Sequence, residues 1–137
     1  MSQLSSLSVN RGLLLLRIAL GVVFVMHGWQ KLAVYGISGV AGGFGQMGFP
    51  LPTVNAVLIT TVELVGGVML LAGAGTRIVA ALLAFAMLVA TVVAHGTGGF
   101  FLPTGYEFAL TLMLVSLALT QTGAGRYSVD ARLSRVH

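Results

Sequence analysis

The sequence predicts an all-α integral membrane protein, folded as a four-helix bundle. Of its 137 residues, 57% are hydrophobic and only 7% are charged, whereas about 25% of the residues are charged in an average soluble domain. No alternating pattern of about ten residues recurs, so membrane-spanning strands are not indicated. A helix needs about 20 apolar residues to cross the hydrocarbon core, and the chain has four such runs, near residues 12–32, 52–74, 77–97 and 105–122. We therefore expect one domain, residues 1–137, whose main partner is the lipid bilayer.

The first run begins like a secretory signal, because Arg11 precedes it, but no small-x-small cleavage site follows. The run continues into His27 and Lys31, which predicts a retained helix. We expect the polar residues 1–10 before it to be frayed or interfacial. At about 100° per residue, Arg17, His27 and Lys31 fall on one side of this helix. That side should point into the bundle and the other side should contact lipid.

The stretch at 36–51 is rich in glycine and has no charge. Its scattered apolar residues predict a short interfacial helix, or lid, between the first and second spanning helices. The alternative is an interfacial loop with no role of its own. Pro50 and Pro52 are expected to end this segment and to open the second spanning helix.

The basic residues predict the orientation of the chain. With four spans, the two termini and the link near residues 73–76 lie on one side of the membrane, and the other side offers only Lys31. Since basic residues are enriched on the cytoplasmic side, both termini should be cytoplasmic. The basic residues of the terminal side are Arg11, Arg77, Arg126, Arg132 and Arg135.

Composition also excludes several functions. The net charge is +4 and the pI is about 10.4, but this reflects a scarcity of acids, and no basic stripe or RNA-binding motif accompanies it. We therefore predict no nucleic-acid partner. The chain has no cysteine, which excludes disulfides, a thiol relay, iron–sulfur ligands and a CxxCH haem attachment. No set of metal ligands stands out, so no metal site is predicted.

Two charged residues are expected deep in the membrane. An ionisable side chain there costs about 2.5–3.5 kcal/mol on insertion scales, so each one needs a reason. We predict that Arg17 of the first run and Glu63, near the centre of the second, form a buried pair. Such a pair either fixes helix register or takes part in binding or proton transfer. Gly66 and Gly67 follow on the face of Glu63 and are expected to allow close helix packing.

The remaining polar groups are expected to converge at the other end of the bundle. An up-and-down arrangement brings His27, Lys31, His95 and Glu107 to one layer, which makes them candidate ligand-binding or proton-relay residues. Donors, a proton source and an apolar slot suit a quinone. Haem b is the weaker alternative, since it needs His27 and His95 on opposite faces of the ring. A third reading is an interfacial polar cluster that serves packing or a protein partner.

Taken together, several segments resemble the DoxX family of small bacterial membrane proteins. The resemblance covers about residues 12–130 and rests on the order and spacing of all the segments. They are RIALGVVFVMHGWQKL at 17–32, MGFPLP at 47–52, VELVGGVMLLAGAGTR at 62–77, His95 with the Gly and Phe residues after it, GYEFAL at 105–110 and GRYSVD at 125–130.

The resemblance implies a four-helix protein of the bacterial plasma membrane. Family members are similar to the small membrane subunit of an archaeal thiosulfate:quinone oxidoreductase, and some are linked to quinone or thiol stress and to assemblies with detoxifying enzymes. The absence of cysteine argues against direct thiol or thiosulfate chemistry by this chain. The polar positions that recur in the family would here be Arg17, Lys31, Glu63, His95 and Glu107, with His27 beside them.

These observations predict an accessory protein or subunit of a membrane oxidoreductase, in a quinone-linked redox or detoxification system. It would bind a quinone-like molecule near the outer face, and a partner oxidoreductase would transfer the electrons. No flavin or nicotinamide motif is present, so whether the chain is itself an enzyme stays open. The alternatives are a scaffold that recruits partner proteins, and a small transporter that couples to protons through Glu63 and requires a homo-oligomer.

Overall fold

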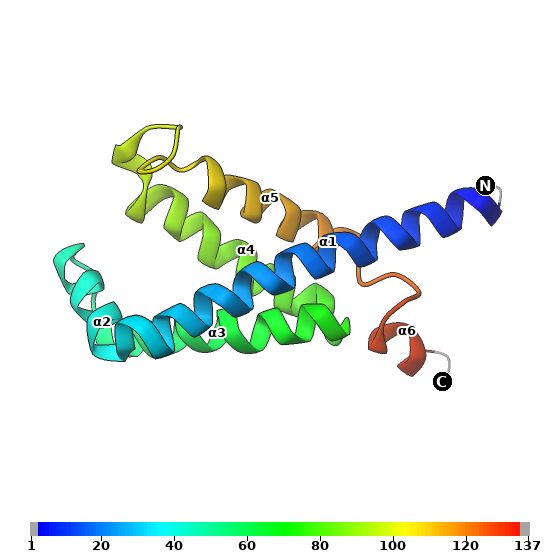
Figure 1. The fold of residues 1–137 in the computed structure, drawn as a ribbon, viewed down its shortest axis with the longest axis horizontal. Helices are drawn as coiled ribbons and strands as arrows, with labels where there is room; N and C mark the ends of the chain where they lie inside the picture. Colours follow the sequence, from blue (N-terminus) through cyan, green and yellow to red (C-terminus); the bar gives the residue numbers. More distant parts are fainter. Residues whose placement is uncertain (1–2, 135–137) are drawn as a thin grey trace.

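The computed structural model describes residues 3–134, and within that range it contains helices and no strands (Figure 1). The all-α prediction is therefore confirmed. In chain order, the elements are α1 (Gln3–Trp29), the π-helix η1 (Gln30–Tyr35), α2 (Gly36–Gln46), α3 (Pro52–Ala72), α4 (Thr76–Val89), the π-helix η2 (Ala90–Ala94), the 3₁₀ turn η3 (Gly96–Gly98), α5 (Glu107–Thr122) and α6 (Val129–Leu133).

Among the described residues, three helices are long and apolar enough to cross a membrane: Ser6–Gln46, Pro52–Ala72 and Thr76–Ala94. The fourth predicted span corresponds to α5, which has 16 residues and so measures about 24 Å. Its crossing of the bilayer stays a prediction. The first helix starts at Gln3, well before the apolar run begins, so the expected fraying of the polar segment is wrong from residue 3 onward.

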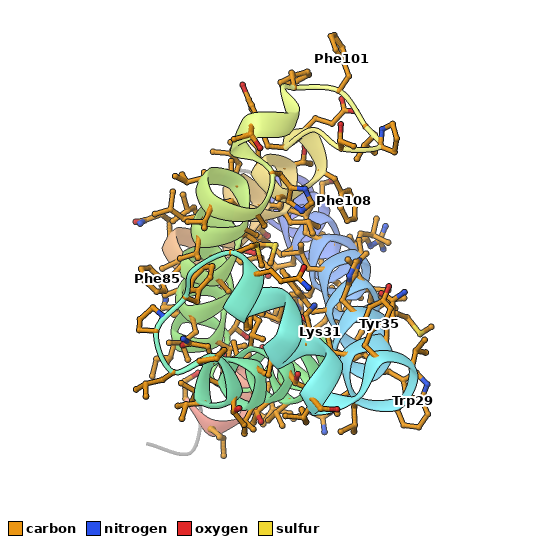
Figure 2. All side chains as sticks on the ribbon, turned by 90° about the vertical axis from the view of Figure 1, so that its left-hand side faces the viewer. Trp29, Lys31, Tyr35, Phe85, Phe101 and Phe108 are labelled. Atoms are coloured by element: carbon orange, nitrogen blue, oxygen red, sulfur yellow. The ribbon has the colours of Figure 1, made fainter. Side chains whose placement is uncertain are left out.

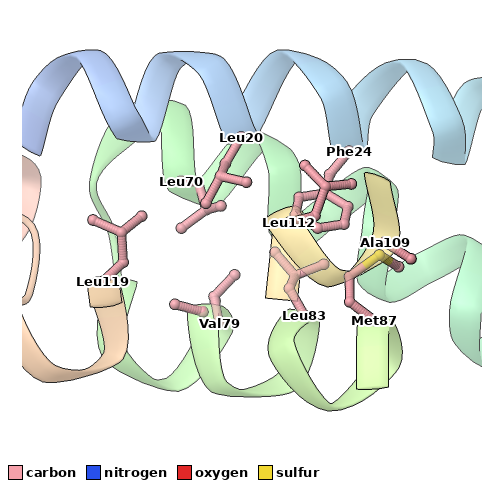
Figure 3. Packing of buried hydrophobic residues seen from close by; sticks show 10 residues of the cluster. Leu20, Phe24, Leu70, Val79, Leu83, Met87, Ala109, Leu112 and Leu119 are labelled. Atoms are coloured by element: carbon pink, nitrogen blue, oxygen red, sulfur yellow. The ribbon is translucent and has the colours of Figure 1, made fainter. Parts of the chain in front are cut away.

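Four helices share one apolar core. Helix α3 lies between α1 and α4, α4 packs on α5, and α5 returns to contact α1. Figure 3 shows the core that these helices enclose, to which α1 contributes Leu20 and Phe24 and α3 contributes Leu70. The core residues from α4 and α5 are Val79, Ala80, Leu83, Met87, Ala109, Leu112 and Leu119. The outward apolar side chains, such as Leu15 and Phe85, are free to contact lipid.

Glycines set the close approach of α1 to α3. A Cβ on Gly28 would lie 2.6 Å from the backbone nitrogen of Leu64, and one on Gly67 would lie 2.7 Å from that of Val25. Gly67 is thus a packing residue, as predicted, and it works with two glycines of α1, Gly21 and Gly28. Gly66 instead faces side chains of α4. Because backbone meets backbone at these points, the glycines fix which residues of α1 and α3 lie opposite each other.

The predicted short helix between the first two spanning helices is present as α2. It has 11 residues, buries only Ala41, and packs against α3. The π-helix η1 joins it to α1, and Gly36, with φ of 69°, redirects the chain where η1 ends. Whether α2 acts as a lid stays a prediction.

The two ends of the bundle differ in content. The start of α1, the link at residues 73–75 and α6 lie at one end, which we call the terminal end (Figure 1). Segments η1, α2, η2 and η3 lie at the other, the loop end. At the loop end α2 and the loop at 99–106 lie apart from each other (Figures 1 and 2).

Candidate functional site

An ion pair joins the loop end of the first helix to the middle of α3. Lys31 on η1 places its Nζ 2.6 Å from Oε2 of Glu63 on α3, and the two side chains are 21% and 3% exposed. This is the only ion pair within residues 3–134. In Figure 2, which looks onto the loop end, Lys31 lies near the centre of the molecule and Trp29 at its edge. Glu63 is thus enclosed by the bundle, whereas Lys31 keeps part of its side chain exposed.

The predicted pair between Arg17 and Glu63 is wrong, because helix register separates the two residues. Gly28 lies against Leu64, so Glu63 is opposite the turn of α1 that contains Gly28. The eleven residues from Arg17 to Gly28 correspond to about 16 Å of helix. Both residues are buried, as predicted, with 1% and 3% of their surface exposed, but each has another partner.

Arg17 binds backbone carbonyls at the terminal end. Its Nε donates to Leu70 O at 2.9 Å and its Nη2 to Leu71 O at 3.1 Å, both in the last turn of α3. Its Nη1 donates to Ala124 O and Tyr127 O, each at 2.8 Å, in the segment after α5. The guanidinium thus joins α1, α3 and the C-terminal segment, and the negative end of the α3 dipole helps to balance its charge.

Asp130 completes this terminal cluster and had no predicted role. Its Oδ1 accepts from Gly75 N–H at 2.7 Å and its Oδ2 from Thr76 N–H at 3.0 Å, at the start of α4. Burial alone would raise the pKa of Asp130. The hydrogen bonds from Thr76 and Gly75, together with the positive charge of Arg17, outweigh burial and hold that pKa below its usual value. The cluster is structural in character.

Two further features mark the surroundings of the Lys31–Glu63 pair. The hydroxyl of Thr60, one turn before Glu63 on α3, is buried and has no hydrogen-bond partner among the described residues. Lys31 also lies within a π-helix, a form that occurs mostly as short segments and often at functional sites. Neither feature was predicted from the sequence. Thr60 could have been found, because it is a polar residue one helical turn before Glu63, but no sequence pattern indicates the π-helix.

His27 lies beside the pair and reaches toward α5. Its ring centroid is 6.1 Å from that of Phe108, with the planes tilted by 35°. Its imidazole is half-buried and interacts electrostatically with both Lys31 and Glu63. The loop end thus brings together His27, Lys31 and Glu63, from α1, η1 and α3.

The four residues of the predicted layer are not joined to one another, since η1 and α2 lie apart from the loop at 99–106 (Figures 1 and 2). His95 has its Nδ1 3.4 Å from Thr104 O, and Glu107 accepts from Leu102 N–H at 2.8 Å. Both therefore serve the loop at 99–106. Among the described residues, no hydrogen bond or ion pair links them to Lys31 or Glu63.

The fold and the buried polar clusters define a small multi-pass membrane protein. The chain belongs to the DoxX family, whose profile matches residues 12–96. It is 36% identical over 113 residues to "Putative oxidoreductase CatD" of Bacillus subtilis, covering 82% of this chain and 81% of that protein.

Two other relatives are membrane proteins by name. An uncharacterized membrane protein of Mycobacterium tuberculosis is 34% identical over 131 residues, covering 88% of this chain and 80% of the relative. The inner membrane protein YphA of Escherichia coli is 29% identical over 126 residues, covering 88% and 89%. No solved structure matches the chain.

Proposed function

We propose that this DoxX family protein is an accessory protein or subunit of a membrane oxidoreductase system and binds a quinone-like lipophilic molecule at the loop end. The observation that carries the proposal is the partly buried Lys31–Glu63 pair, 2.6 Å long, beside His27. The Thr60 hydroxyl, one turn before Glu63, has no hydrogen-bond partner among the described residues. The name of the Bacillus subtilis relative, "Putative oxidoreductase CatD", supports an association with redox chemistry.

The chemistry of a quinone suits these groups. Reduction to the quinol takes two electrons and two protons, and the protons go to the two carbonyl oxygens. The ammonium of Lys31 can donate a hydrogen bond to one oxygen while Glu63 balances its charge. His27 and the Thr60 hydroxyl offer further donors. We assign the electrons to a partner oxidoreductase, so this chain positions the ring and handles protons.

The surroundings suit a lipophilic ligand as well. The Phe108 ring next to His27 provides an apolar face, and the rest of the bundle surface exposes apolar side chains such as Val22 and Met26 to lipid. A ligand with a polar ring and a hydrocarbon tail can place the ring at the pair and the tail in the bilayer.

A thermal unfolding measurement tests the proposal. A short-chain menaquinone or ubiquinone analogue at 100 times its Kd should stabilise the detergent-purified protein by about 2.7 kcal/mol. The double variant Lys31→Met/Glu63→Gln removes both charges, leaves no uncompensated ion, and should lose the shift. Glu107→Gln is the matched control, since its carboxylate serves its own loop, and should keep it. An equal shift in the double variant, or with an analogue that lacks both carbonyls, contradicts the proposal.

Proton-coupled transport is a second candidate function, because the buried carboxylate of Glu63 lies near the middle of α3. A carboxylate at that depth is typical of proton-coupled carriers, and four helices would then need a homo-oligomer to enclose a pathway. Proton-driven uptake into vesicles that is lost in Glu63→Gln would favour the transporter over the quinone binder.

We also propose that the protein resides in a bacterial plasma membrane with its terminal end in the cytoplasm. The basic residues Arg11, Arg77, Arg126 and Arg132 lie toward that end, and Lys31 lies toward the other. This asymmetry matches the enrichment of basic residues on the cytoplasmic side. The relative YphA, which is named as an inner membrane protein, agrees with this location.

A further inference from the structure

We infer that the terminal end holds a binding site for the head group of an anionic phospholipid, formed by Arg126 and Arg132. These two residues lie after α5 and on α6, far from the Lys31–Glu63 pair. The site is therefore independent of the function proposed above.

The two arginines line one surface hollow of about 410 Å³. Ala72, which also lines it, is the last residue of the membrane-spanning helix α3. The hollow thus lies where the hydrocarbon core ends, at the height of the lipid phosphates. Basic pockets at this height typically bind anionic head groups.

No carboxylate of the described chain competes for these arginines. The sequence has three acidic side chains. Glu63 pairs with Lys31 inside the bundle, and Glu107 accepts from Leu102 N–H at the loop end. Asp130 is turned toward the backbone N–H groups of Gly75 and Thr76.

Two other arginines near this end, Arg17 and Arg77, bind backbone carbonyls. Arg17 binds four carbonyls, and Arg77 donates to Thr120 O and Gln121 O at the end of α5. The side chains of Arg126 and Arg132 are exposed and form no ion pair with any described residue. Arg126 lies over the ring of Tyr127 at 5.5 Å, which leaves its N–H groups available to an external anion.

Apolar groups beside the arginines favour a lipid over a soluble phosphate. Tyr127, Val129 and Leu133 are 40%, 39% and 61% exposed, and the first two line the hollow. A free phosphate gains nothing from this surface, whereas the glycerol backbone and upper acyl chains of a phospholipid can cover it. Guanidinium groups bind phosphate oxygens in a bidentate manner, which suits two arginines that share one hollow.

Lipid binding to the detergent-purified protein tests this inference by native mass spectrometry and thermal unfolding. The probes are phosphatidylglycerol, phosphatidylcholine with the same acyl chains, and inorganic phosphate. The variants are Arg126→Gln/Arg132→Gln and Arg11→Gln, which removes a positive charge on α1 outside the hollow.

We expect phosphatidylglycerol to be retained at least fivefold more than phosphatidylcholine and to raise the unfolding midpoint by several degrees. The Arg126→Gln/Arg132→Gln variant should lose this preference, and Arg11→Gln should keep it. An equal preference in the double variant, equal retention of both lipids, or the same shift with inorganic phosphate overturns the inference. If the Gln variant fails to purify, Arg126→Lys/Arg132→Lys should bind at least threefold more weakly, and unchanged binding overturns the inference.

Discussion

Lys31 on η1 donates a hydrogen bond of 2.6 Å to Glu63 on α3 and so ties the loop end of the first helix to the middle of the next spanning helix. Glu63 is 3% exposed, so its charge depends on this partner. Because Gly28 and Gly67 leave no room for a Cβ between the two helices, they fix the helix register, and the same register places Lys31 opposite Glu63.

Lys31→Met should destabilise the protein by about 3–5 kcal/mol, because it leaves the Glu63 carboxylate buried without a counter-charge. The double variant Lys31→Met/Glu63→Gln should recover most of that loss, since neither charge remains. Thermal unfolding in detergent measures both effects. If Lys31→Met is as stable as the parent, the Glu63 carboxylate does not depend on Lys31 as its counter-charge.

Arg17→Met should cost at least about 3 kcal/mol, since the guanidinium makes four hydrogen bonds to carbonyls and such charged bonds contribute about 1.5 kcal/mol or more each. Arg17→Lys should recover only part of the stability that Arg17→Met loses, because one ammonium cannot reach carbonyls on both α3 and the C-terminal segment. Arg11→Lys, on the exposed part of α1, is the control and should be neutral. If Arg17→Lys is as stable as the parent, the branched guanidinium is not needed to bridge α3 and the C-terminal segment.

Asp130 should make stability depend on acid pH. Its pKa lies below the ordinary value of 3.8 when folded, so its contribution is fully present above pH 3.8 and is lost as the pH falls through the lowered value. Asp130→Asn should be less stable than the parent at neutral pH and converge with it in acid. Unfolding midpoints between pH 3 and pH 7 measure this, and a difference that persists unchanged at the lowest pH speaks against the assignment.

Gly28→Ala should force α1 and α3 apart, because its Cβ would lie 2.6 Å from the Leu64 nitrogen and 2.8 Å from its Cα. We expect a loss of about 1–3 kcal/mol from overpacking. Gly12→Ala, on the same helix with nothing within 4 Å of the new Cβ, should be neutral or stabilising by up to about 1 kcal/mol. Equal effects of the two substitutions on the unfolding midpoint would contradict the close approach of α1 and α3 at Gly28.

Single cysteines report the orientation, since the chain has none of its own. Thr97→Cys in η3 and Ser134→Cys after α6 are both exposed and lie at opposite ends. With the terminal end in the cytoplasm, an impermeant maleimide should label Thr97→Cys in intact cells and Ser134→Cys only after permeabilisation. The reverse pattern would invert the proposed topology.

Hydropathy and glycine spacing were sufficient to predict the long apolar helices and part of their packing. The apolar runs correspond to α1, α3, α4 and α5, and Gly67 lies at a close helix contact. The burial of Arg17 and Glu63 also followed from the cost of charge in lipid. These features depend on local sequence, which is why composition and periodicity revealed them.

The partners of the buried charges depend on register, which local sequence does not encode. Glu63 pairs with Lys31 because Gly28 meets Leu64, and a different glycine contact would have selected another base. Asp130 reaches the start of α4 only because the chain after α5 folds back over the terminal end. His95 and Glu107 miss the pair since α4 and α5 diverge from α1 and α2, a tertiary feature with no sequence signal.

The central claim is that a quinone-like molecule binds at the Lys31–Glu63 pair, and photoaffinity labelling tests it most directly. An azido-quinone analogue is cross-linked to the protein in lipid nanodiscs, and the labelled peptides are mapped by mass spectrometry. We predict labels within residues 27–35 or 56–63 that excess menaquinone or ubiquinone suppresses and that Lys31→Met/Glu63→Gln abolishes. Labelling confined to other segments, or labelling that excess quinone leaves unchanged, would contradict the account.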